Sequence, residues 1–192
     1  MTFSLPNILT YSRILAIPVV VGLMMLDRPL GNWLALAVYV AACITDFLDG
    51  YFARAWDQQS SLGRFLDPIA DKLLVAAVLL MLVGVDAIEG LALLPAALIL
   101  CREILVSGLR EFLAGARVGM PVSQLAKWKT GLQMTVIGVL IVGDALPNIG
   151  PFTVIDIGVA GLWIAAVLTI ITGADYMIAG IKHIRATGSD RR

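Results

Sequence analysis

Four aspartates in the first half of this 192-residue chain are spaced as two pairs that could bind metal ions. Asp46 and Asp49 are three residues apart, and Asp67 and Asp71 are four apart, so on helices each pair projects from one face. Clustered carboxylates beside apolar segments repel one another unless cations bind between them. Hard divalent ions such as Mg²⁺ or Mn²⁺ prefer oxygen ligands, and two such ions about 3.5–4 Å apart commonly assist displacement at phosphorus. The spacing therefore predicts a site for two divalent metal ions.

The elements that must position these acids are membrane helices. Hydrophobic residues make up 59% of the sequence and charged residues 15%, and the mean hydropathy is +0.91, which indicates an integral membrane protein. A helix needs about 20 apolar residues to cross the hydrocarbon. The sequence predicts an all-α protein with one membrane domain over residues 1–192 and six transmembrane helices near residues 8–26, 33–55, 67–85, 88–113, 126–145 and 152–181.

Basic residues indicate which helix ends face the cytoplasm. Arg and Lys gather between the second and third predicted helices, between the fourth and fifth, and in the C-terminal tail, whereas the opposite turns hold only Arg28. We therefore expect both termini and the aspartates to lie on the cytoplasmic side. The net charge of zero gives no indication of a nucleic-acid partner.

The depth of the acids favours a lipid headgroup as the ligand. The second and third helices are joined by a short polar link and must run antiparallel, which brings the two aspartate pairs together. Asp46 precedes Arg54 by eight residues, about 12 Å along a helix, so the acids lie beneath the cytoplasmic interface. Gly50 and Ala53 leave room beside them for a bulky ligand.

Structural roles are the alternative for each aspartate, namely a salt bridge or a helix cap. Asp67 is followed by Pro68, which matches a helix N-cap followed by proline at the first helical position. Asp67 is therefore a cap, a ligand, or both. Two matched pairs favour function over four separate structural roles.

The full pattern from Asp46 to Asp71, D-x2-D-G-x2-A-R-x8-G-x3-D-x3-D, resembles the signature of the CDP-alcohol phosphotransferase family. The six predicted helices agree with that family's fold. The resemblance implies that a substituted phosphate passes from a CDP-linked donor to an alcohol, with CMP leaving. It also implies that the four aspartates bind two divalent metals, that Asp71 serves as general base, and that the protein is a homodimer. By the same resemblance, the residues at the nucleotide donor are Gly50, Ala53, Arg54 and Ser60.

Three further blocks resemble the branch of this family that uses CDP-diacylglycerol as donor and glycerol 3-phosphate as acceptor. They are LPNILTYSRI at residues 5–14, REILVSGLREF at residues 102–112 and KWKTGLQM at residues 127–134. In this branch Asn7 and Thr10 lie near the donor. The resemblance to bacterial members also implies location in the inner membrane.

The acceptor of that branch carries a phosphate, which basic side chains must hold. Arg110 lies at the end of a predicted helix, and arginine can bind phosphate through two hydrogen bonds, so we expect it to be a phosphate ligand. Lys127 and Lys129 are either further ligands or the basic residues common at any cytoplasmic helix end. Arg102 is either a fourth ligand or simply paired with its neighbour Glu103.

Two alternatives remain open at this point. A different acceptor, such as serine, inositol phosphate or phosphatidylglycerol, would keep the metal chemistry, but an acceptor without phosphate would not need the basic cluster. A divalent-cation transporter could use the four acids as its ion site, yet such proteins usually place broken helices at mid-membrane and often contain internal repeats. Here the acids lie near one face and no repeat is visible, which favours the transferase.

Overall fold

The computed structural model describes the backbone of residues 5–56, 61–115 and 123–189, and the side chains of those residues except 5–7, 49–56, 61, 62, 64, 175, 179 and 182–189. The prediction of an all-α protein with six long helices is confirmed. The six helices are α1 (Leu5–Met24), α2 (Leu30–Trp56), α3 (Ser61–Gly84), α4 (Leu93–Gly115), α5 (Gln124–Val142) and α6 (Val154–Ser189). The 3₁₀ turn η1 (Gly90–Ala92) directly precedes α4, and the 3₁₀ turn η2 (Gly143–Ala145) directly follows α5.

The apolar lengths of these helices make this a multi-pass membrane protein. Among the described residues, four stretches are long and apolar enough to cross a membrane, and they lie in α2, in η1 with α4, in α5 with η2, and in α6. The apolar part of α1, Ile8–Met24, is shorter. Large apolar side chains point outward on several helices, among them Leu15, Leu80 and Ile178, as expected for surfaces that face lipid.

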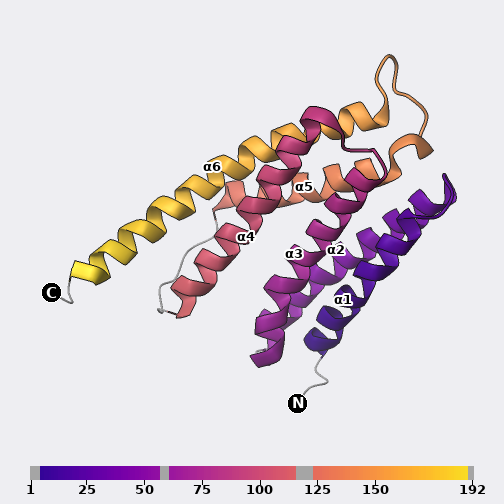
Figure 1. Cartoon of the computed structure of the whole chain (residues 1–192). Coiled ribbons are helices and arrows are strands. Elements are labelled where there is room, and N and C mark those ends of the chain that lie inside the picture. The colour runs from indigo at the N-terminus through magenta and orange to yellow at the C-terminus, as the bar shows by residue number, and fades with distance from the viewer. Residues whose placement is uncertain (1–4, 57–60, 116–122, 190–192) are drawn as a thin grey trace.

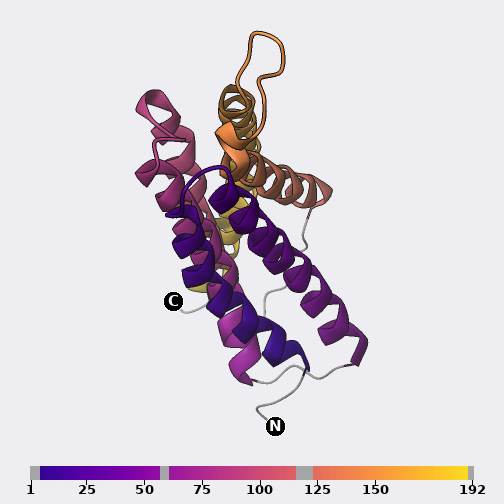
Figure 2. The same ribbon diagram turned by 90° about the vertical axis from the view of Figure 1, so that its right-hand side faces the viewer.

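The helices form two groups that meet where α2 packs against α5 and where α3 packs against α4 (Figure 1). The first group is α1 with α2 and α3, and Figure 2 shows α1 lying between the other two. The second is α6 with α4 and α5. Every helix contributes to one buried core, whose members include Val20, Tyr39, Leu82, Ile99, Ile137 and Leu162.

Glycines allow α6 to approach α5 closely. A Cβ atom built on Gly158 would lie 2.5 Å from Cδ2 of Leu140, and one built on Gly161 would lie 2.6 Å from Cγ2 of Val136. Lipid offers little hydrophobic driving force for helix association, so close van der Waals packing across small residues must supply much of it. The α5–α6 contact therefore depends on these two glycines.

The start of α3 corrects one expectation about the aspartates. The helix begins at Ser61, more than a turn before Asp67, and Pro68 lies inside it. The alternative that Asp67 is an N-cap is therefore wrong. Proline inside a helix removes the hydrogen bond to the carbonyl four residues earlier, and here α3 continues through that defect. Asp67 projects from the side of the helix, where it can reach other helices.

The helix ends and the turns that connect them gather at two opposite ends of the bundle. The start of α1, the end of α2, the start of α3, and the C-terminal ends of α4 and α6 all lie toward one end in Figure 1. At the other end Arg28 binds Asp144 through an ion pair of 2.8 Å and donates a hydrogen bond of 3.1 Å to the carbonyl of Val85. Arg28 thus joins the three turns that connect the helices there.

Candidate active site

A pocket of about 560 Å³ brings together acids and bases that are far apart in the sequence. Helices α2 and α3 contribute Asp46, Asp67 and Asp71 to its lining, and α4 contributes Arg102 and Arg110. The three predicted aspartates whose side chains are described thus line one pocket. One pocket holds carboxylates that could bind cations and guanidinium groups that could bind anions.

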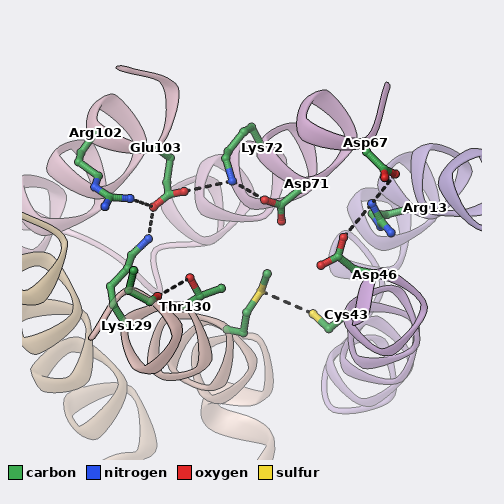
Figure 3. A network of polar contacts seen from close by, with 12 residues as sticks. Arg13, Cys43, Asp46, Asp67, Asp71, Lys72, Arg102, Glu103, Lys129 and Thr130 are labelled. Carbon is green, nitrogen blue, oxygen red and sulfur yellow. Dashed lines mark hydrogen bonds and ion pairs between the residues drawn. The ribbon is translucent and has the colours of Figure 1, made fainter. Parts of the chain in front are cut away.

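Helix α1 supplies a buried guanidinium to the acid side of this pocket. The Nη1 atom of Arg13 lies 2.9 Å from Oδ1 of Asp46 and 3.7 Å from Oδ1 of Asp67, and its side chain is only 1% exposed (Figure 3). One turn earlier on α1, the hydroxyl of Thr10 donates a hydrogen bond of 2.7 Å to Asp67. Arg13 and Thr10 therefore fix the positions of two carboxylates from different helices.

On the other side of the pocket from Arg13, Glu103 of α4 binds three basic side chains. Its carboxylate binds the ammonium of Lys129, lies 3.0 Å from Nη1 of Arg102 and lies 3.1 Å from Nζ of Lys72. Lys72 also binds Asp71, so it bridges the two carboxylates (Figure 3). The resulting network of ion pairs links Asp71 to the basic side chains of Arg102 on α4 and Lys129 on α5. Because three cations surround two acids, the network has a surplus of positive charge.

A second pocket of about 200 Å³ adjoins the first between α3, α4, α5 and α6. Asp71, Lys72, Arg102, Glu103 and Arg110 line both pockets, so the two lie side by side. The second pocket adds Lys129, which is almost fully buried, and the side chains of Gln133 and Tyr176. This inner region is polar although it lies among membrane helices.

The structure brings most of the described candidates to these pockets. Arg102 and Arg110 line both, and Lys129 lines the second. Arg102 is also paired, as one alternative held, because it binds Glu103 and donates a hydrogen bond of 3.0 Å to Thr172. Lys127 is exposed and lines neither pocket, so a role for it in anion binding stays a prediction.

Several predicted site residues cannot be placed. Ser60 lies outside the described residues, and so do the side chains of the remaining candidates from the N-terminus and the end of α2. Their roles stay predictions. The residues concerned are Asn7, Asp49, Gly50, Ala53 and Arg54.

The sequence-based candidates missed Arg13, Lys72 and Glu103. Each is a charged residue in an otherwise apolar helix, and such residues usually face the bundle interior and pair with one another. That rule could have selected all three as site candidates. It could not have shown that Arg13 reaches the aspartates of α2 and α3, because that contact depends on how α1 packs.

The oxygen ligands that the three aspartates offer suit a hard divalent cation. Asp46, Asp67 and Asp71 offer only carboxylate oxygens, the ligand type that Mg²⁺ and Mn²⁺ prefer. Among the described side chains, no three of His, Cys, Asp and Glu lie close enough together to enclose an ion. Arg13 and Lys72 instead contact these acids, which shows that the site attracts positive charge.

Comparisons with known proteins identify one matching family and several similar proteins. The family described as CDP-alcohol phosphatidyltransferase matches residues 3–171. A protein of Rickettsia bellii is 48% identical over 180 residues, covering 94% of this chain and 97% of the relative. Relatives from Cereibacter sphaeroides and Shigella flexneri are each 38% identical and cover 96% and 93% of this chain, and 99% and 96% of their own lengths. All three relatives are named CDP-diacylglycerol–glycerol-3-phosphate 3-phosphatidyltransferase.

Proposed function

Because this chain belongs to the CDP-alcohol phosphatidyltransferase family, we propose that it transfers the phosphatidyl group from CDP-diacylglycerol to glycerol 3-phosphate. The products are phosphatidylglycerophosphate and CMP, so the protein is a transferase of phospholipid biosynthesis. The observation that carries the proposal is the pocket in which Asp46, Asp67 and Asp71 face a space shared with Arg102 and Arg110. A donor diphosphate and an acceptor phosphate need such a combination of groups.

The reaction exchanges one phosphorus–oxygen bond for another. A hydroxyl oxygen of glycerol 3-phosphate attacks the phosphorus that bears the diacylglycerol, and the bond from that phosphorus to CMP breaks. Asp71 accepts the hydroxyl proton, and CMP departs with the bonding electron pair. Lys72 contacts the Asp71 carboxylate and so restricts its orientation toward the acceptor. The same lysine links Asp71 to the side of the pocket where the acceptor phosphate binds.

Two divalent cations, Mg²⁺ or Mn²⁺, complete the proposed site. Asp46, Asp49, Asp67 and Asp71 are the residues that would hold them. When bound, they neutralise charge that develops on the diphosphate and on the leaving CMP. Thr10 and Arg13 keep Asp46 and Asp67 in place on this side of the pocket.

The acceptor phosphate binds on the basic side of the pocket. Arg102, Arg110 and Lys129 line the second pocket there, and Glu103 binds Arg102 and Lys129. With Arg110 the side chains of the network carry a net charge of +2, which a dianionic phosphate balances, and guanidinium groups can bind it through paired hydrogen bonds. This arrangement favours glycerol 3-phosphate over serine, which has no phosphate.

The site faces the cytoplasm of a bacterial inner membrane, and both termini lie on that side. The support is the concentration of Arg and Lys near the helix ends on the side of the aspartates. The fatty-acid chains of the donor stay in the bilayer while its headgroup enters the pocket. A homodimer also belongs to this proposal, and it rests on family resemblance alone.

Replacement of the proposed base tests the function. We expect purified Asp71→Asn to lose incorporation of labelled glycerol 3-phosphate into lipid, while its helix content and melting temperature stay close to those of the wild type. Asp144→Asn is the matched control, because Asp144 lies at the opposite end of the bundle on Arg28. Near-normal incorporation by Asp71→Asn would refute the assignment of the base.

A further inference from the structure

Two residues that line the second pocket, Gln133 and Tyr176, each have a buried polar atom without a hydrogen-bond partner within the described part of the chain. The atoms are Oε1 of Gln133 and the hydroxyl oxygen of Tyr176. Gln133 is 2% exposed and Tyr176 is 7% exposed, and both line the pocket. Polar atoms as buried as these almost always form a hydrogen bond, and leaving one unpaired is costly. Because both residues line the pocket, a ligand with hydrogen-bonding groups or an ordered water in this space would supply the missing partners.

The surroundings of these atoms limit the chemistry of the ligand. Lys129 and Arg102 line the same pocket and suit an anion, while Asp71 lines it and suits a group that gives up a proton. Tyr176 forms a small buried apolar cluster with Val106 of α4 and Ala126 of α5. The ligand therefore carries an anionic group, a reacting hydroxyl and at least one further polar group.

We infer that Gln133 and Tyr176 bind the middle hydroxyl of glycerol 3-phosphate and so determine which acceptor is used. This inference rests on the proposed function. The phosphate of the acceptor binds the basic residues and its terminal hydroxyl faces Asp71, which leaves the hydroxyl on the second carbon without a partner. That hydroxyl donates to Oε1 of Gln133 and accepts from the hydroxyl of Tyr176, and each side chain gains the bond that it lacks.

Such a site selects strongly against acceptors that lack the middle hydroxyl. When a buried site is built to hydrogen-bond a substrate hydroxyl, an analogue without that group leaves the protein atoms unpaired again. One net hydrogen bond corresponds to about a tenfold difference in kcat/KM. The wild type should therefore prefer glycerol 3-phosphate over 3-hydroxypropyl phosphate, which has the reacting hydroxyl and the phosphate only, by at least about tenfold.

Two variants and one control test the inference. Tyr176→Phe and Gln133→Met each remove the proposed partner and keep most of the side-chain volume. Thr169→Val is the matched control, because the Thr169 hydroxyl is also buried and without a partner in the described structure but does not line the pocket. The measured quantity is the ratio of kcat/KM for glycerol 3-phosphate to that for 3-hydroxypropyl phosphate. Taking this ratio within one preparation cancels any loss of folded protein.

We expect this ratio to fall about tenfold in Tyr176→Phe and in Gln133→Met, because kcat/KM should fall for glycerol 3-phosphate and stay the same for 3-hydroxypropyl phosphate. In Thr169→Val the ratio should stay unchanged. Equal losses with both acceptors would overturn the inference and leave the proposed function standing, because the two atoms would then serve packing or bind water. Absence of any transfer to glycerol 3-phosphate by the wild type would overturn the proposed function, and the inference with it.

Discussion

Neutralising Glu103 should destabilise the protein more than any other single charge change in the basic network. Its carboxylate is 9% exposed and binds Lys129, which is 2% exposed, as well as Arg102 and Lys72. Glu103→Gln keeps the shape but leaves three cations with the charge of Asp71 alone. Breaking a buried ion pair from one side costs about 3–5 kcal/mol. Arg102 and Lys72 are 14% and 25% exposed and can turn toward water, so we expect a total loss of about 3–5 kcal/mol, chiefly from Lys129.

Unfolding in detergent micelles, followed by circular dichroism with increasing denaturant, measures this loss. Lys129→Met alone should cost less, because Glu103 keeps its two other cations. The double variant should lose less than the sum of the single losses, since residues in contact couple by about 0.5–3 kcal/mol. Glu111→Gln, on the exposed side of α4, is the control, with an expected change within about 0.5 kcal/mol. If Glu103→Gln unfolds like this control, or if the losses simply add, the reasoning is wrong.

Three further changes probe other parts of the structure. Arg13→Met removes the guanidinium between Asp46 and Asp67, so the melting temperature of the variant should fall when no divalent cation is present. Added Mg²⁺ should then raise the melting temperature of the variant more than that of the wild type, and an equal rise in both would contradict this reasoning. Gly161→Ala places a Cβ 2.6 Å from Val136 and should cost about 1–3 kcal/mol of unfolding free energy, whereas Gly22→Ala, with no atom within 4 Å of its Cβ, should cost nothing. Arg110→Ala should raise the KM for glycerol 3-phosphate far more than that for CDP-diacylglycerol, and equal increases would contradict its contact with the acceptor phosphate.

The sequence was sufficient to predict the six helices and that Asp46, Asp67 and Asp71 lie in one region of the fold. Apolar segments of membrane-spanning length are a strong signal, and three- or four-residue spacing places two side chains on one helix face whatever the rest of the fold does. Local rules were less reliable at the start of α3. The pair Asp67-Pro68 matched a helix start, but α3 begins at Ser61 and continues through Pro68.

The contacts that connect the two sides of the pocket could not be predicted in the same way. Lys72 bridges Asp71 and Glu103 only because α3 and α4 lie side by side at that depth. The sequence allowed Lys129 to be either a phosphate ligand or one of the basic residues common at cytoplasmic helix ends. Its burial against Glu103 shows that it belongs to the interior of the bundle. Tertiary packing decides such cases, and one sequence carries little information about it.

Release of CMP from CDP-diacylglycerol by the purified protein, with Mg²⁺ or Mn²⁺ present, tests the central claim most directly. Glycerol 3-phosphate, serine, inositol phosphate and phosphatidylglycerol are supplied in turn as acceptors. The proposed chemistry predicts CMP release with glycerol 3-phosphate alone. Release with serine instead would contradict the proposed role of Arg102, Arg110 and Lys129, and absence of release with every acceptor would contradict the proposal that the aspartate pocket catalyses phosphatidyl transfer.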